Sequence, residues 1–385
     1  MMKISPSGAY GDVLEQALYN GVLSGMALDG KSFFYVNPLE VVSEACQKDQ
    51  RKKHVKPIRQ KWFACACCPP NLARLFASIG GYLHFIRAET LYTNLYVTST
   101  SEFTFQGLPI KLHMDSAYPF DEKIHISLSL PRPMEFSYAV RIPAWCADYH
   151  VLINGKICAG TLKDGFLYLH RCWRDGDEVE LTLSMPVRVV RANSLVGENI
   201  GKSAICRGPI VYCMEQTDNG PQLHRNRICG KPSFTISSGE ENLKGLPCIS
   251  CSGEYLLPDG TQLYTSAKES FQPKTLRFIP YFAWCNRSPG EWQFGYAMIP
   301  SNIKIEKESF NMEQNQISVA LVGLSFGLEF LPIYLEHPDV KEVWIVEKNE
   351  SCSNSHRNAM ESQQKGAPRH TRLFWKTPKS TPFIL

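Results

Sequence analysis

The spacing of apolar residues near the N-terminus predicts two amphipathic helices. Between Gly11 and Leu28, apolar residues recur at steps of three and four, which is the period of a helix that buries one face. Asp29-Gly30 follows this run, and glycine readily adopts the left-handed conformation that ends many helices. The residues from Asn71 to about Ile79 show the same period and are followed by Gly80-Gly81, with Asn71 as the expected N-cap.

The pattern changes from helical to alternating at about residue 86. Apolar and polar residues then alternate, as in half-buried strands of antiparallel sheets, in the segments 91–97, 124–130 and 179–185. Asn-Gly and Asp-Gly pairs, which favour tight turns, recur at 154–155, 164–165 and 175–176. We therefore expect two β-sandwich domains, at residues 86–190 and 191–308, after a helical region at residues 1–85.

A third pattern begins near residue 316. An apolar strand is followed by the glycine turn Gly323–Gly327, a helical stretch and a second apolar strand that ends at Glu347. This order is typical of the opening of a dinucleotide-binding βαβ unit, although Ser325 and Leu328 stand at the second and third fingerprint positions. Such a domain needs about 100 residues. Residues 316–350 therefore predict a truncated Rossmann-like unit that binds no cofactor.

Residues 351–385 show no core periodicity and predict a disordered tail. The tail holds six Lys or Arg and one acid, so it carries +5, whereas the whole chain sums to +4 and residues 1–350 to −1. Few aromatic residues besides Phe374 and Trp375 accompany these basic side chains, so we expect no nucleic-acid partner.

The rest of the composition is ordinary for a soluble chain of several domains. No apolar run reaches the roughly 18 residues of a membrane span, and the N-terminus lacks the apolar segment of a signal peptide. The 14 cysteines are scattered along the chain rather than regularly framed. We therefore expect a cytoplasmic protein with mostly free thiols and no membrane partner.

The stretch with the most specific chemistry is Cys65-Ala66-Cys67-Cys68-Pro69-Pro70-Asn71. Neighbouring thiols oxidise one another or capture metal, so the cluster indicates a metal site, a nucleophile or both. It also lies just before a predicted helix. Unpaired N–H groups and the helix dipole favour a thiolate at that position.

Other cysteines favour simpler interpretations. The pairs Trp145-Cys146, Cys172-Trp173 and Trp284-Cys285 are most simply core residues of the sandwiches. Cys248 and Cys251 form an isolated CxxC in an expected loop, where zinc or redox chemistry is a minor alternative.

Several motifs resemble those of glycoside hydrolase family 127, the β-L-arabinofuranosidase family. The resemblance covers about residues 10 to 305. Its motifs are the cysteine cluster with Trp62-Phe63 before it, and the segments 17–20, 26–31, 33–40, 141–145, 207–212 and 215–219. It implies the remnant of an (α/α)6 barrel followed by two β-sandwich domains. Together with the truncated βαβ unit, the expected fold is multidomain α + all-β. Residues 316–347 separately resemble the start of the Gfo/Idh/MocA oxidoreductases.

The first resemblance implies a retaining glycosidase that acts on L-arabinofuranoside-containing glycans. In the family a zinc-bound cysteine thiolate attacks the anomeric carbon, and a glutamic acid serves as acid and then base. By motif, Cys67 would be the nucleophile and a zinc ligand, Cys68 a second ligand and Cys65 a structural neighbour. Tyr35 matches a position that contacts the sugar; a packed aromatic with a solvated hydroxyl is the alternative.

The sequence also departs from the family. The family's acid/base Glu and the Glu-x-Cys that completes its zinc site lie upstream of the segment that residues 10–20 match. Glu44-Ala45-Cys46 has the right residue types, but it falls in the polar stretch after residue 40, where an exposed loop is the simpler interpretation. Two thiolates alone do not close a tetrahedral zinc site.

We therefore expect an incomplete and inactive glycosidase fragment joined to the start of a dehydrogenase. Exposed inner helix faces make a homo-oligomer a candidate assembly. Two alternatives remain open: a β-sandwich carbohydrate-binding or assembly module with an inert cysteine cluster, and a remnant of a nicotinamide-dependent oxidoreductase.

Overall fold

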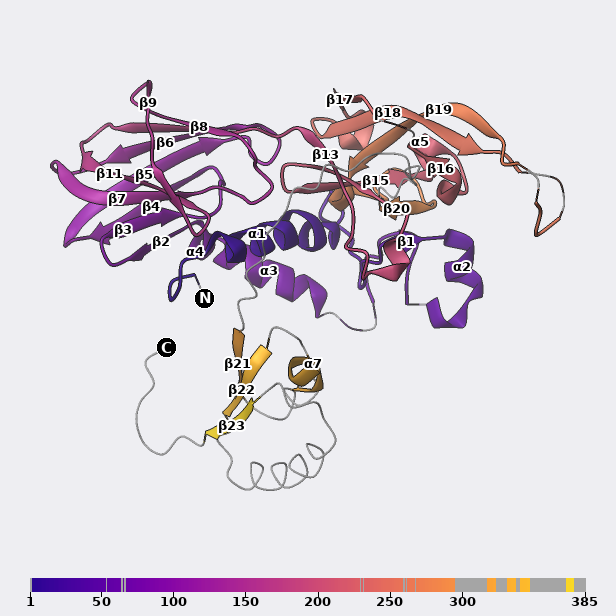
Figure 1. Cartoon of the computed structure of the whole chain (residues 1–385), viewed down its shortest axis with the longest axis horizontal. Helices are drawn as coiled ribbons and strands as arrows, with labels where there is room; N and C mark the ends of the chain where they lie inside the picture. Colours follow the sequence, from indigo (N-terminus) through magenta and orange to yellow (C-terminus); the bar gives the residue numbers. More distant parts are fainter. Residues whose placement is uncertain are drawn as a thin grey trace. The chain divides into compact units, whose positions relative to one another are not determined.

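The computed structural model describes residues 2–294 except 53, 64, 66, 229, 231, 259, 261 and 267, together with 317–322, 331–336, 340–346 and 372–376. The chain divides into two compact units, Met1–Ile303 and Lys304–Leu385. Figure 1 labels their helices and strands, and we describe each unit by itself. None of the helices in the described residues is long and apolar enough to span a membrane.

The N-terminal region holds the expected helices with changed boundaries. Helix α1 (Gly8–Gln16) continues directly into the π-helical segment η1 (Ala17–Val22), which confirms the first predicted helix. Helix α3 (Cys68–Ser78) is followed by α4 (Gly80–Leu83). The prediction of Asn71 as N-cap is wrong, because α3 begins three residues earlier and has prolines in its first turn. Proline is tolerated there, since the first N–H groups of a helix have no intrahelical acceptor.

The polar stretch after residue 40 is also more ordered than the sequence predicts. It contains strand β1 (Glu40–Val41), helix α2 (Ser43–Lys48) and the 3-10 turn η2 (Gln50–Lys52). Glu44 and Lys48 form an ion pair one turn apart on α2, which supports a short helix. Glu44-Ala45-Cys46 is therefore helical, and the interpretation as an exposed loop is wrong.

Two sheets built from residues 84–183 form a sandwich (Figure 1). The five-stranded sheet has the order β10-β11-β7-β3-β2, and the six-stranded sheet has the order β4-β5-β6-β12-β8-β9. Along β5, Ile110, Leu112 and Met114 are buried while the residues between them are exposed, as the alternating sequence predicts. The rings of Phe105 and Phe136, one from each sheet, lie 5.0 Å apart in the shared core.

The bounds of these strands are as follows: β2 His84–Arg87, β3 Thr90–Thr93, β4 Ser99–Phe105, β5 Leu108–Ser116, β6 Lys123–Ser129, β7 Met134–Arg141, β8 Tyr149–Ile153, β9 Lys156–Ile157, β10 Thr161–Lys163, β11 Phe166–Trp173 and β12 Glu178–Leu183.

In the next region the strands are connected by hydrogen bonds into one nine-stranded sheet. Its main path is β1-β20-β15-β19-β18-β16, and β13, β14 and β17 branch from it. Strand β15 pairs with β14, β19 and β20 and so links all parts. The second β-sandwich stays a prediction. Strand β1 from the N-terminal region pairs with β20, so residues 40–41 belong to this sheet.

Its strands are β13 Val187–Val190, β14 Ala204–Arg207, β15 Ile210–Glu215, β16 Asn226–Arg227, β17 Phe234–Ser238, β18 Pro247–Leu256, β19 Phe271–Pro280 and β20 Trp292–Phe294. Short helical segments connect them: η3 Gly197–Asn199, α5 Gln216–Asn219, η4 Leu223–Arg225, η5 Glu241–Leu243 and η6 Tyr281–Ala283.

The CxxC at Cys248 and Cys251 lies on β18, and both side chains are buried. The expected loop is therefore wrong. Burial raises the pKa of Cys251 to about 11, so this thiol stays protonated at neutral pH. The fully buried Trp173 and Trp284 confirm the core positions predicted for them. Cys172 is exposed, so the core position predicted for this residue is wrong.

The second unit contains a parallel three-stranded sheet of order β21-β22-β23. Strand β21 (Ile317–Val322), helix α7 (Leu331–Glu336) and strand β22 (Val340–Val346) follow the predicted order, whereas Gly323–Gly327 and Glu347 lie outside the described residues. The prediction of disorder in the tail is wrong for β23 (Arg372–Lys376), because this strand pairs with β22. Five residues are too few to show a periodicity, so only the pairing reveals this strand.

Candidate functional site

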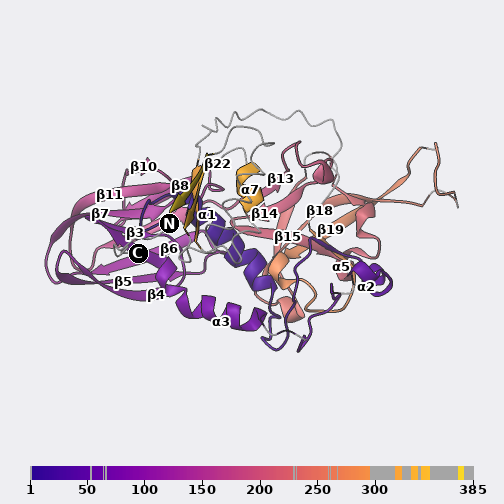
Figure 2. The ribbon, with the colours of Figure 1, turned by 90° about the horizontal axis from the view of Figure 1, so that it is seen from below.

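The cysteine cluster lies at the N-terminus of α3. Cys67 is the N-cap and Cys68 the first helical residue, and their sulfur atoms lie 3.9 Å apart. Cys65 and Cys67 are exposed, and Cys68 is half-buried. Helix α3 has no fully buried residue, in agreement with its place at the edge of the N-terminal unit in Figure 2. Reagents and ligands in solution can therefore reach the thiols.

The structure brings Tyr35 to this cluster. Its phenol oxygen lies 3.7 Å from the sulfur of Cys67, within hydrogen-bond distance for sulfur. When Cys67 is a thiolate, the tyrosine hydroxyl can only donate to it. This contact, followed by contacts with Cys65 and Cys68, holds the pKa of Cys67 below its usual value. The same contact raises the pKa of Tyr35 to about 12, because a phenolate beside a thiolate is unfavourable.

Cys68 behaves in the opposite way. Burial first, and then the neighbouring Cys67, raise its pKa. Of these two adjacent thiols, Cys67 therefore loses its proton first and Cys68 keeps one to donate. This is the arrangement that a single sulfur nucleophile needs.

Packing on both sides of Tyr35 fixes its place. Phe33 and Gln60 exchange two backbone hydrogen bonds of 2.9 and 3.0 Å, and the ring of Phe63 lies 5.7 Å from that of Tyr35. On the opposite face of this extended segment, Phe34 stacks on Trp284 with centroids 4.1 Å apart and planes within 2°. The sequence placed Phe34 and Phe63 in motifs of the family resemblance but assigned a role only to Tyr35; the packing of the two phenylalanines comes from the structure.

The described residues do not complete a zinc site. Zinc takes four ligands in structural sites and at least three protein ligands in catalytic ones. Among the residues with a described placement, no group of three or more His, Cys, Asp or Glu side chains could hold a metal ion. Glu44 is paired with Lys48, and Cys46 is buried in the core, so neither joins Cys67 and Cys68 in such a group.

The motif at residues 141–145 docks α1 against the sandwich. Arg141 is completely buried and pairs with Asp12 at 2.7 Å and with Glu15 at 2.5 Å, both on α1. Trp145 donates from its indole nitrogen to Glu15 over 3.2 Å. The residues of this motif therefore hold the helical region in place and take no part in the thiol site.

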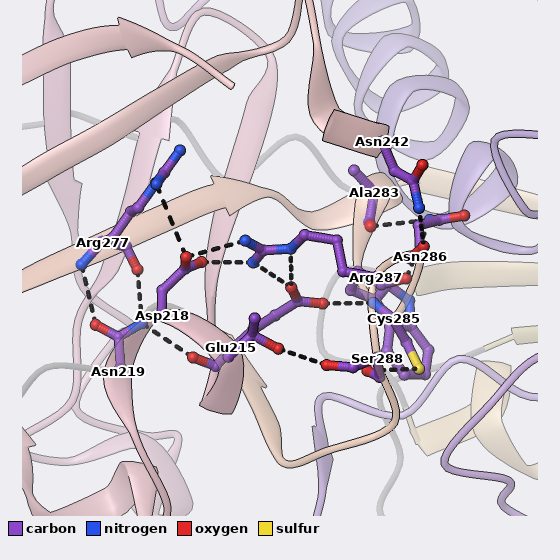
Figure 3. A network of polar contacts seen from close by, with 12 residues as sticks. Glu215, Asp218, Asn219, Asn242, Arg277, Ala283, Cys285, Asn286, Arg287 and Ser288 are labelled. Atoms are coloured by element: carbon purple, nitrogen blue, oxygen red, sulfur yellow. Dashed lines mark hydrogen bonds and ion pairs between the residues drawn. The ribbon is translucent and has the colours of Figure 1, made fainter. Parts of the chain in front are cut away.

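The motif at residues 215–219 is a second buried anchor (Figure 3). Arg287 donates to the carboxylates of Glu215 and Asp218. Glu215 also accepts from the backbone N–H of Cys285. Asn219 donates to the backbone oxygen of Arg277 and accepts from its N–H. These contacts fix the loop that follows Trp284.

Three family models match successive parts of the chain. The GH127 catalytic domain of β-L-arabinofuranosidase matches residues 1–81, the GH127 middle domain residues 90–185 and the family's C-terminal domain residues 187–294. Residues 1–294 belong to glycoside hydrolase family 127. The cysteine cluster lies within the match to the catalytic-domain model.

Individual relatives agree with this family. The chain is 37% identical over 304 residues to a non-reducing end β-L-arabinofuranosidase of Bifidobacterium longum, and the match covers 76% of this chain and 46% of that protein. A GH127 β-L-arabinofuranosidase structure from Geobacillus stearothermophilus T6 matches with 41% identity and a TM-score of 0.75, over 78% of this chain and 48% of that one. A further GH127 β-arabinofuranosidase structure matches with 32% identity and a TM-score of 0.68, over 78% and 47%. The chain thus spans about half the length of these relatives.

Proposed function

We propose that residues 1–294 provide the nucleophile of a retaining β-L-arabinofuranosidase, with Cys67 as the attacking group. The contact between Tyr35 and Cys67 at the N-terminus of α3 carries this proposal, because it favours a thiolate on one exposed sulfur. The names of the relatives supply the substrate class, an L-arabinofuranoside at a non-reducing end.

In the proposed reaction, the Cys67 thiolate attacks the anomeric carbon and forms a carbon–sulfur bond. The bond from that carbon to the glycosidic oxygen breaks, and the leaving oxygen takes a proton from a general acid. Water then breaks the carbon–sulfur bond, so two displacements retain the anomeric configuration. Tyr35 donates a hydrogen bond to the thiolate before attack, and Cys68 keeps its own proton. We assign the general acid to no described residue.

Zinc binding is a separate part of the proposal. Cys67 and Cys68 have the soft sulfur chemistry that zinc prefers, and they would supply two of its ligands. Zinc binding would require Cys68 to lose the proton that it keeps in the absence of metal. The described residues supply no group of three ligands, so no reaction step above depends on the metal. For the same reason we propose that this chain alone does not turn over substrate.

An activated substrate tests the nucleophile without requiring turnover. The full chain is incubated with a β-L-arabinofuranosyl fluoride and then digested for peptide mass spectrometry. A pentosyl adduct on Cys67 that is absent in Cys67→Ser is expected, and Cys172→Ser, which removes an exposed thiol on β11, should label like wild type. Glycan binding without any adduct on Cys67 would favour a carbohydrate-binding module. Turnover with stoichiometric zinc would overturn the proposal that the chain is incomplete.

For the unit Lys304–Leu385 we propose a partial nucleotide-binding fold similar to the start of the Gfo/Idh/MocA oxidoreductases. The parallel pairing of β21 and β22 around α7 supports a βαβ unit. A sheet of three described strands is small for a dinucleotide domain, so we propose no bound cofactor.

A further inference from the structure

Arg59 is a buried cation with an unusual set of partners. Arg59 is only 6% exposed. The guanidinium donates to the backbone oxygens of Trp284 (2.5 Å), Ser24 (2.9 Å) and Phe282 (3.4 Å). Its central carbon lies 4.5 Å from the ring centroid of Phe34 and 5.2 Å from that of Trp284.

This arrangement stabilises the charge without an ion pair. Within the described residues, Arg59 takes part in no salt bridge, and its Nε has no hydrogen-bond partner. Carbonyl dipoles and two aromatic faces contact the guanidinium directly, and the more distant carboxylate of Glu215 adds a favourable charge interaction. Burial lowers the pKa of Arg59 to about 10, so the group remains charged at neutral pH.

The contacts of Arg59 converge on the segment that presents Tyr35. Phe34, which lies under the guanidinium, directly precedes Tyr35 in the chain. Gln60, the residue after Arg59, pairs through its backbone with Phe33. Arg59 therefore holds both the segment that carries Tyr35 and the segment beside it against the backbone around Trp284.

The backbone around Trp284 is itself fixed. Cys285 has a φ of 53°, a conformation that non-glycine residues rarely adopt. Its N–H donates to Glu215, which also accepts from Arg287 (Figure 3). A movement of Trp284 would have to break this buried network, so Arg59 and Phe34 contact a rigid surface.

We propose that Arg59 is a positioning residue that keeps the Tyr35 hydroxyl beside the Cys67 sulfur. It does so by contacting both Phe34 and Trp284 and thereby holding the two rings together. This inference rests on the proposed role of Cys67 as nucleophile. Arg59 touches neither the thiol nor any reacting atom, so it acts only through Tyr35.

The test measures alkylation of Cys67 by iodoacetamide in the folded full-length chain at about pH 7.5, after metal is removed with a chelator. Arg59→Met should slow this reaction about threefold or more, because a displaced Tyr35 no longer stabilises the thiolate. Tyr35→Phe should slow it equally, and the double variant should be no slower than either single one. Arg59→Lys keeps the charge without the planar fork of donors and should give a rate between Arg59→Met and wild type.

Arg188→Met is the matched control. Arg188 also lies near an indole ring, 5.9 Å from Trp145, and donates to a backbone oxygen, that of Gly208, so its loss should leave Cys67 unchanged. A folded Arg59→Met variant with the wild-type rate, or a double variant whose losses multiply, would overturn the inference. If Arg59→Met does not fold, Phe34→Leu carries the same expectation and the same refutation.

The reference thiol Cys172 separates the two proposals. If wild-type Cys67 reacts no faster than Cys172, which is also exposed, the proposed nucleophile is wrong. If Cys67 reacts faster but is indifferent to Arg59, only the positioning role is wrong.

Discussion

The phenol oxygen of Tyr35 lies 3.7 Å from the sulfur of Cys67, although 32 positions separate the two residues in the chain. The contact joins an extended segment to the N-cap of α3. It places a hydrogen-bond donor and a helix N-terminus at one exposed thiol, and both favour the thiolate. The first prediction follows from this pair.

Tyr35→Phe should raise the pKa of Cys67. The tyrosine hydroxyl is the largest of the influences that keep this pKa low, and phenylalanine cannot donate a hydrogen bond. Below the thiol pKa, the rate of iodoacetamide alkylation at Cys67 should fall about three- to tenfold, and the loss should disappear at higher pH where both proteins are thiolates. The pH profile of alkylation, followed by peptide mass spectrometry, measures the shift.

Tyr264→Phe is the control for this experiment, because Tyr264 is 93% exposed. Its pH profile should match that of wild type. A profile of Tyr35→Phe that coincides with wild type would show that the hydroxyl does not act on Cys67.

Zinc content should report how incomplete the metal site is. We expect the purified full chain to retain less than one zinc ion after dialysis, since the described residues provide no group of three ligands. Cys67→Ser and Cys68→Ser should each lower this content further, and Cys172→Ser should not. Elemental analysis by mass spectrometry gives the ratio, and one tightly held zinc per chain would contradict the expectation.

Arg141→Met should strongly destabilise the N-terminal unit. The substitution leaves Glu15, whose side chain is 1% exposed, as a buried charge without its partner. We expect a loss of about 3–5 kcal/mol in the free energy of unfolding, measured by urea titration with tryptophan fluorescence. Lys111→Met breaks the exposed pair of Lys111 and Glu102 and should change stability by less than about 0.5 kcal/mol. Equal effects of the two substitutions would mean that Arg141 does not anchor α1.

Nicotinamide cofactors should not bind to the C-terminal unit. Its described sheet has three parallel strands, fewer than the several strands that line a dinucleotide site. Titration of the full chain with NADH, followed by cofactor fluorescence, should show no saturable change up to about 1 mM, which corresponds to a binding free energy weaker than about −4 kcal/mol. A saturable change at lower concentrations would favour the oxidoreductase alternative.

The sequence by itself determined most element types and the chemistry of the cluster. A period near 3.6 or of 2 is a local property, so α1, α3 and the alternating strands such as β5 follow from it directly. The thiols of Cys65, Cys67 and Cys68 are adjacent in sequence, so their proximity needed no fold. The family resemblance also rested on such short local motifs.

Only the tertiary structure decided which segments meet. Arg59 contacts the backbone of Trp284 across 225 positions, β1 pairs with β20, and Cys248 is covered in the core although it reads as part of a loop. An apolar residue in the sequence indicates that its side chain will be buried, but it does not indicate which other segment will cover that side chain. Phe34 stacks on the indole of Trp284, a residue 250 positions away that follows β19 of the nine-stranded sheet. This long-range contact holds the segment that brings Tyr35 to Cys67.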